Sequence, residues 1–198
     1  MLATAQQLLR QSFTVVILSM CVGLSPASAD PGSARAKAPS LPDKISVQLV
    51  PMILNPEMVP SDPGASSNAT LAGVDSNSNG LRDEVERWIA QNYPQCARYR
   101  AALSQVALSV QRRILAGEVT EESALQMASE ESSATMCFAV ESESCEAASL
   151  EKFIEFSVLL QNTPERGKAF LRLYKKLGKK LQEAPAEGCT IPSQQLPN

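Results

Sequence analysis

The sequence predicts an all-α protein: a small disulfide-linked bundle of about five helices over residues 82–198, preceded by an irregular extended segment and a polar loop. Two observations lead to this prediction. From residue 82 onward, apolar residues recur at intervals of three and four, the spacing of one face of a helix. Ser, Thr, Gly and Pro residues interrupt that spacing at places suited to helix ends. With 198 residues, the chain is long enough to form one domain with a hydrophobic core.

Residues 1–29 have the three-part pattern of a secretory signal peptide. Arg10 supplies the basic part, Phe13–Leu24 is an apolar run too short to span a bilayer, and Ala27–Ala29 is an A-x-A cleavage site. We therefore expect export to the periplasm or to the outside of the cell. A less favoured alternative is a lipoprotein beginning at Cys21, because Met20 stands where such a signal needs a small residue. We expect no transmembrane segment in the mature chain.

Residues 30–74 precede the predicted helices and divide into two parts. Residues 30–44 are rich in Ala, Pro, Ser and Gly and cannot bury enough apolar surface to offset their ordering entropy, so they predict a flexible leader. Residues 45–74 begin with the apolar, β-branched stretch Ile45–Leu54, which predicts a short extended segment. Pro51 restricts that segment to an edge or an irregular strand. Pro56–Asn68 is expected to be a loop because of its Pro, Gly, Ser and Asn content.

Residues 75–86 place oxygen-bearing groups at the offsets that a twelve-residue calcium loop requires. Ca²⁺ is a hard cation that takes about six to eight oxygen ligands, and a glycine at position 6 allows the sharp turn between them. The candidate ligands are Asp75, Asn77, Asn79, Leu81 through its carbonyl, Asp83 and Glu86. The alternative is a tight turn followed by acidic residues at a helix N-terminus, which leaves the first two ligands without a role.

This pattern resembles an EF-hand loop, and more closely the calcium loops of dockerin and thrombospondin type 3 repeats, because Pro60, Pro63 and Gly73 leave no room for a full entering helix. The resemblance covers about a dozen residues. It departs from a paired EF-hand at position 8, where Arg82 replaces the aliphatic residue that bridges to a partner loop, and no second loop exists. Three carboxylates and one loop imply weak binding, with a dissociation constant on the order of 10⁻⁵ to 10⁻³ M.

Five helices are expected after the start of this loop. Thr120 is the predicted N-cap of the third helix, and Thr163 is the N-cap of the last, with Pro164 in its first turn. Gly117 is expected to end the second helix. The predicted ranges are Asp83–Asn92, Cys96–Ala116, Thr120–Val140, Ser144–Gln161 and Pro164–Leu181.

The four cysteines beyond the signal peptide predict two disulfides formed in an oxidising compartment. They are Cys96, Cys137, Cys145 and Cys189. Zinc is less favoured because the chain has no histidine and no C-x-x-C pair. A helical hairpin that turns at Gly117 would bring Cys96 beside Cys137 and leave Cys145 to pair with Cys189, so we favour this connectivity over the other two.

The last helix has a basic face opposite its apolar stripe. This face could contact an anionic membrane or a phosphate-rich envelope polymer, although a solvated face near the glutamate-rich middle helices is the favoured interpretation. The candidate contact residues are Arg172, Lys175, Lys176, Lys179 and Lys180.

The remaining composition argues against several functions. A net charge of −3 gives no basic footprint for nucleic acid. The absence of histidine and of nucleophile or phosphate-binding motifs leads us to expect no enzymatic activity. The sequence therefore favours an exported calcium-binding helical protein that acts as a binding or structural module, and it does not identify a protein or envelope partner.

Overall fold

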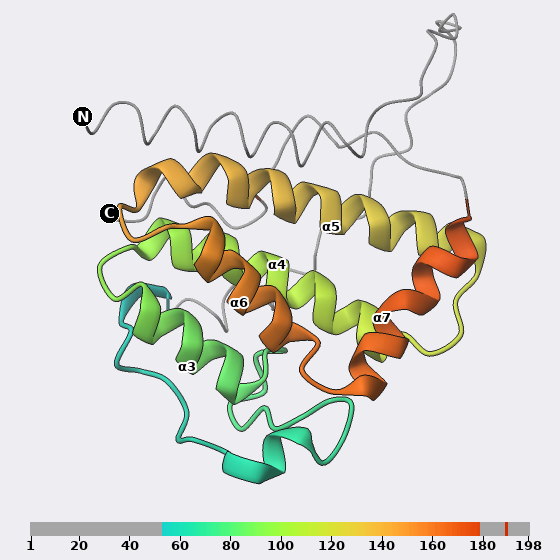
Figure 1. Ribbon diagram of the computed structural model, residues 1–198, viewed down its shortest axis with the longest axis horizontal. Helices are drawn as coiled ribbons and strands as arrows, with labels where there is room; N and C mark the ends of the chain where they lie inside the picture. Colours follow the sequence, from blue (N-terminus) through green and yellow to red (C-terminus); the bar gives the residue numbers. More distant parts are fainter. Residues whose placement is uncertain (1–52, 179–188, 190–198) are drawn as a thin grey trace, which may run out of the picture. The chain divides into compact units, whose positions relative to one another are not determined.

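The computed structural model describes residues 53–178 and Cys189, all within the second of two compact units, residues 38–198 (Figure 1). The predicted signal peptide, the leader, most of the extended segment, and Lys179 and Lys180 lie outside the described residues. The prediction of an all-α, disulfide-linked helical bundle is confirmed. The elements are η1 (Gly64–Asn68), α3 (Asp83–Asn92), α4 (Ala97–Leu115), α5 (Glu121–Glu141), η2 (Ser142–Ser144), α6 (Leu150–Leu160) and α7 (Pro164–Leu177).

Several predicted helix ends are confirmed in their chemistry. The Thr120 hydroxyl accepts a hydrogen bond from the backbone N–H of Ser123, and the Thr163 hydroxyl accepts one from the backbone N–H of Arg166. Gly117 follows α4 with a φ of 62°, a conformation that glycine adopts at little cost. Each threonine hydroxyl satisfies a backbone N–H group that the helix itself leaves without a partner.

Three predictions of secondary structure are wrong. The last helix ends at Leu177 rather than Leu181, because Gly178 follows it with a φ of 58°. The fourth helix begins at Leu150 rather than Ser144, because Ser149 is extended and its hydroxyl caps the helix by accepting from the N–H of Lys152. Ile53 and Leu54, expected to be extended, lie in a helical turn. Ile53 is 1% exposed, and its carbonyl accepts hydrogen bonds from the guanidinium of Arg100. The buried guanidinium of Arg100 therefore holds Ile53, the first described residue, against α4.

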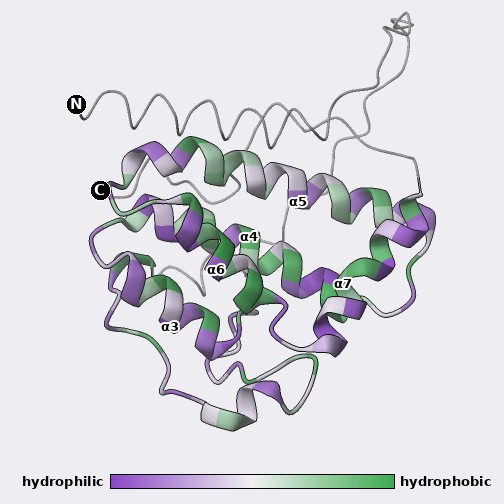
Figure 2. Cartoon of the chain, viewed as in Figure 1, coloured by the Kyte–Doolittle hydropathy of each residue, from purple (hydrophilic) through white to green (hydrophobic). Residues whose placement is uncertain are grey.

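α4 is the central helix of the bundle. It contacts α3, α5, α6 and α7, and 15 of its 19 residues are buried. Figure 2 shows apolar residues concentrated on α4, α5 and α6, whereas the chain around η1 is largely polar or neutral. Burial of these apolar side chains is the main source of stability for the helical part of the molecule.

A closed ring of aromatic contacts joins α3, α4, α5 and α6. Each ring lies 4.1–6.4 Å from the next, between centroids, within or near the range in which aromatic pairs attract one another. In contact order the members are Trp88, Tyr93, Tyr99, Phe138, Phe153 and Phe156.

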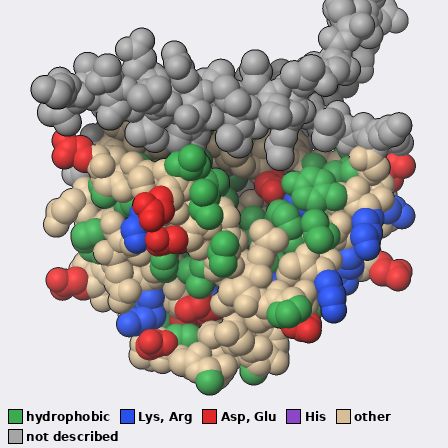
Figure 3. Space-filling view, viewed as in Figure 1, with side chains coloured by type: hydrophobic (Ala, Val, Ile, Leu, Met, Phe, Trp, Pro, Cys, Tyr) green, Lys and Arg blue, Asp and Glu red, His purple; other side chains and the backbone are tan. Residues whose placement is uncertain are grey.

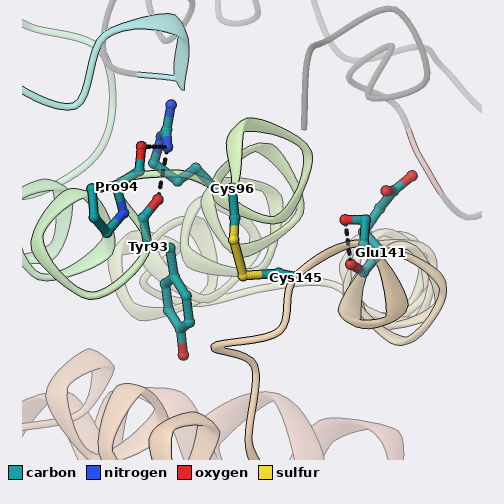
Figure 4. The surroundings of a disulfide bond; sticks show 7 residues. Tyr93, Pro94, Cys96, Glu141 and Cys145 are labelled. Carbon is teal, nitrogen blue, oxygen red and sulfur yellow. Dashed lines mark hydrogen bonds between the residues drawn. A yellow bond between two sulfur atoms is a disulfide. The ribbon is translucent and has the colours of Figure 1, made fainter.

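The disulfides join different cysteines from those we expected. Cys96 is bonded to Cys145, and Cys137 to Cys189, so the predicted pairing of Cys96 with Cys137 is wrong. Figure 4 shows Cys96, at the start of α4, reaching the chain that follows α5, with Tyr93 and Pro94 close by.

The register of the α4–α5 hairpin explains the error. The Gln105 amide donates to Cys137 Sγ over 3.2 Å, and Arg112 pairs with Glu130 at 3.0 Å. In both pairs the two residue numbers average to 121, the first residue of α5, so the hairpin is symmetric about Glu121 rather than about Gly117. The first turn of α5 therefore extends past α4, where Ala124 packs against α7. The same register carries the start of α4 beyond the end of α5, to the position of Cys145.

Candidate metal centre

The predicted calcium loop lies directly before α3 and continues into its first turn. Ser78 and Gly80 have positive φ values of 58° and 90°, which give the loop its sharp reversal. A Cβ on Gly80 would lie 3.1 Å from Leu108 Cδ2, so this position also needs glycine for space. Leu81 is 1% exposed and anchors the far side of the turn in the core.

The side chains of the loop fold it through hydrogen bonds to its own backbone. The Asp75 carboxylate accepts from the N–H groups of Asn79 at 3.1 Å and Gly80 at 2.9 Å. Asp83 accepts from the N–H of Ser76 at 2.9 Å, which bridges the two ends of the loop. The N–H of Leu81 donates to the Asn79 side-chain oxygen at 2.9 Å. These Asx-type contacts define a compact turn.

Glu86, the last residue of the loop, lies in the first turn of α3 and is fully buried. Its carboxylate accepts a hydrogen bond from the amide nitrogen of Asn77 at 3.2 Å and from that of Asn79 at 2.5 Å. Burial raises the pKa of Glu86 to about 7, while the two amides act in the opposite direction and the charges of Asp75 and Asp83 add to the rise. The structure thus brings Asn77, Asn79 and Glu86 into direct contact.

The other two carboxylates do not join that contact. Asp75 and Asp83 bind backbone N–H groups instead. Across residues 53–178 and Cys189, no three or more His, Cys, Asp or Glu side chains form a group able to hold a metal ion. The amide nitrogens of Asn77 and Asn79 face Glu86. Rotating each amide group by half a turn would exchange its nitrogen and oxygen, so that the oxygen would face Glu86 instead. The donor types fit a hard cation such as Ca²⁺.

Arg82, at position 8, leaves the loop and binds the end of α6. Its side chain is 1% exposed, and Nη2 donates to the carbonyls of Leu159 at 2.9 Å and Leu160 at 3.2 Å. Its Nε lies 3.1 Å from Glu84 Oε1. Burial, and then the nearby Arg166, lower the pKa of Arg82 to about 10, and Glu84 acts in the opposite direction. A helix terminus therefore takes the place of the partner loop that position 8 contacts in a paired EF-hand.

Arg166 joins the segment before the loop to the first turn of α7. It has no exposed surface, and it donates to the carbonyls of Ser67 at 2.6 Å, Thr70 at 3.0 Å and Leu71 at 3.2 Å. The side-chain oxygens of two asparagines on either side also accept from its Nη1. Glu84 Oε1 lies 3.9 Å from Nη1.

Sequence reasoning missed the roles of both arginines. Their side chains meet backbone carbonyls that lie about 80 to 100 residues away in the chain, which no local pattern encodes. Gly73 lies between them, with a φ of 72°, and a Cβ there would be 2.6 Å from Arg82 Cδ and 3.0 Å from Arg166 Nη2. The one available signal was Arg82 itself, a charged residue at a position that is normally aliphatic.

The predicted basic face of α7 is only partly a free surface. Lys175 and Lys176 are exposed, and Arg172 is exposed but donates to the carbonyl of Ile114 at 3.2 Å. The glutamates of α5 that we expected near this face pair with arginines of α4 instead: Arg112 with Glu130, and Arg113 with Glu131.

No family model, curated protein or solved structure matches this chain. Within the part of the chain that the structure describes, none of the helices has both the length and the apolar character needed to cross a bilayer. The two disulfides suit an oxidising environment such as that met by exported proteins.

Proposed function

We propose that the protein is an exported calcium-binding helical module, in which Ca²⁺ bound by residues 75–86 stabilises the fold. The observation that supports this most is the environment of Glu86. This carboxylate occupies position 12 of the loop, is fully buried, and faces the side chains at positions 3 and 5, Asn77 and Asn79. A buried carboxylate without a full charge partner is costly, and a divalent cation would offset that cost.

The chemistry of the loop supports the choice of ion. The candidate ligands are three carboxylates, two amides and one backbone carbonyl, which are the oxygen donors that Ca²⁺ accepts. Ca²⁺ tolerates irregular geometry with about six to eight ligands, whereas Mg²⁺ requires near-octahedral geometry and gives up water reluctantly. A flexible set of amides and carboxylates therefore favours Ca²⁺ over Mg²⁺.

Binding at the loop would act on a wider region through Arg82. This residue follows Leu81 in the loop and bonds the end of α6, and its neighbour Arg166 bonds the segment from Ser67 to Leu71. An ion that orders residues 75–86 would thereby stabilise the contacts of the loop with α6 and α7. This gives Ca²⁺ a structural role rather than the opening motion of a sensor.

Export is part of the same proposal. It is supported by the signal-peptide pattern of residues 1–29 and by two disulfides. A single loop with three carboxylates would bind weakly, which suits a compartment with abundant calcium.

Thermal unfolding with and without Ca²⁺ tests the proposal. An ion that binds only the folded loop stabilises by RT ln(1 + [L]/Kd), or ~2.7 kcal/mol at a hundredfold excess over Kd. We expect Ca²⁺ to raise the Tm, and Mg²⁺ to raise it less. Glu86→Gln should remove the shift because it deletes the buried charge, and Asp75→Ala should remove it because position 1 anchors the shell.

Ser76→Ala is the matched control. Position 2 lies outside the ligand set, and its contact with Asp83 uses the backbone N–H, which the substitution retains. We expect this variant to keep the full calcium shift. No shift in the parent at millimolar Ca²⁺, or an undiminished shift in Glu86→Gln, would show that the loop is only a turn.

A further inference from the structure

α7 has apolar side chains on its outer face as well as its inner one. Leu173 and Leu177 are buried against the bundle, as a core helix requires. Leu171 and Tyr174, one turn apart, remain 52% and 47% exposed. Two adjacent exposed side chains of this size form a strip that the fold of the described residues does not cover.

Basic side chains border this strip. Lys168 and Lys175 lie three residues before and four residues after Leu171, so helical geometry places all three on one side of α7. Lys176 and Arg172 are also exposed, and Glu165 is the one acidic residue of the helix. Figure 3 shows a row of basic side chains over α7 with apolar side chains beside it.

The charges on this face are not neutralised by the described part of the chain. Among the ion pairs of residues 53–178, none includes a lysine of α7. Glu130 and Glu131 of α5 pair with α4 arginines. The lysines are therefore available to an external anion.

The face is also rigidly supported from behind. The guanidinium of Arg113 is 3.6 Å from the ring centroid of Phe170 and 4.0 Å from that of Tyr174, and its Nε donates to the Phe170 carbonyl at 2.8 Å. Because Arg113 is 3% exposed, this contact fixes the aromatic side chains from inside the bundle. The outer strip is thus formed before any partner arrives.

We infer that this face of α7 docks on an anionic lipid bilayer. Leu171 and Tyr174 enter the interfacial layer, where aliphatic and tyrosine side chains are stable. Lys168 and Lys175 extend to lipid phosphates, since a lysine stem lies along apolar surface while its ammonium group stays in the polar layer. The strip and the lysines together favour a bilayer over a phosphate-rich polymer, because a polymer would engage the lysines alone. This docking does not depend on the proposed calcium site.

Vesicle co-sedimentation in EGTA tests this inference, since chelation prevents calcium from bridging protein and lipid. The parent should bind vesicles of equal phosphatidylglycerol and phosphatidylcholine, release at high salt, and not bind pure phosphatidylcholine. Lys168→Gln with Lys175→Gln should weaken binding about fivefold for each lysine removed. Leu171→Ser should weaken it several-fold without touching any charge.

α6 offers the matched control for Leu171→Ser. Ile154 and Val158 are 56% and 64% exposed on a helix whose exposed charges include Glu151 and Glu155. Ile154→Ser with Val158→Ser removes more exposed apolar surface than Leu171→Ser does, and should still leave binding unchanged.

Three results would overturn the inference. One is failure of the parent to bind anionic vesicles. Another is equal weakening by the α6 control, which would place the contact elsewhere. The third is loss of binding in the lysine variant while Leu171→Ser binds as the parent does, which would identify a purely ionic partner such as a phosphate polymer.

Discussion

Two neighbouring regions of this protein are stabilised in different ways. In the helical region, residues 87–178, an aromatic ring of contacts and a central buried helix supply an apolar core, and both disulfides begin there. In the loop region, residues 64–86, only Leu81 and Val85 among the seven buried residues are apolar; the others are Ser67, Asn79, Arg82, Asp83 and Glu86. The first region is stabilised by burial, and the second by hydrogen bonds from buried polar groups.

The two regions should differ in how their stability responds to pH, to ions and to single substitutions. Apolar burial does not depend on side-chain protonation or on a bound ion, whereas a buried carboxylate and buried guanidinium groups depend on charge and on exact partners. Removing one partner of a buried charged group leaves the other unsatisfied, which costs more than the interaction itself contributes. Ions, pH and single substitutions should therefore act most selectively on the loop region.

The largest expected effect is a loss of stability in the helical region when one disulfide is removed. Cys96→Ser with Cys145→Ser removes a link between residues 49 apart, which increases the conformational entropy of the unfolded chain. We expect a loss of about 4 kcal/mol in the free energy of unfolding, measured by urea denaturation. A loss below about 1 kcal/mol would mean that the apolar core alone determines the stability of this region.

The next largest effect is a loss of stability in the loop region when Arg166 is replaced. Arg166→Met removes a buried cation that bonds three backbone carbonyls, and should cost about 3 kcal/mol. Arg172→Met, on the same helix but exposed, should cost no more than about 1 kcal/mol. Hydrogen exchange should show the Arg166 variant losing protection first in residues 64–73. Equal losses in the two variants would contradict the role given to Arg166.

The pH should affect the stability of the loop region through the protonation of Glu86. The folded protein without calcium holds this proton more tightly than the unfolded chain does. Its contribution to stability is therefore fully present below the unfolded pKa of about 4.5 and is lost as the pH rises through about 7. We expect a decline on the order of 2 kcal/mol, measured by urea denaturation in EGTA, that Glu86→Gln flattens. An identical decline in both proteins would assign the pH dependence to other groups.

The last effect on stability concerns the glycine that lies beside the two arginines. Gly73→Ala combines a positive φ with a Cβ 2.6 Å from a buried side chain that cannot move aside, and should cost about 2 kcal/mol. Gly64→Ala has a similar φ of 56° but open space around its Cβ, and should cost about 1 kcal/mol. A Tm that falls equally in both variants would show that space at Gly73 is not limiting.

The sequence predicted the helical region better than the loop region, for a physical reason. Helix periodicity and caps such as Thr120 and Thr163 are local, so they can be read from neighbouring residues. The disulfide connectivity depends on how far α5 extends past α4, which packing against α7 determines, and the prediction for Cys96 was therefore wrong.

In the loop region, the turn geometry could be predicted but the wider contacts could not. The reversal at Gly80 and the side-chain oxygens directed to the backbone follow from the residue types. The destinations of Arg82 and Arg166 do not, because backbone carbonyls that are distant in sequence provide the partners. Calcium binding by this loop stays a prediction.

Titration calorimetry of Ca²⁺ into the protein tests most directly whether residues 75–86 form an ion site. For the parent and for Ser76→Ala we expect one bound ion per chain, with a dissociation constant on the order of 10⁻⁵ to 10⁻³ M, and for Glu86→Gln no binding. No binding by the parent at millimolar Ca²⁺, or the same affinity in Glu86→Gln, would contradict a calcium-stabilised loop region.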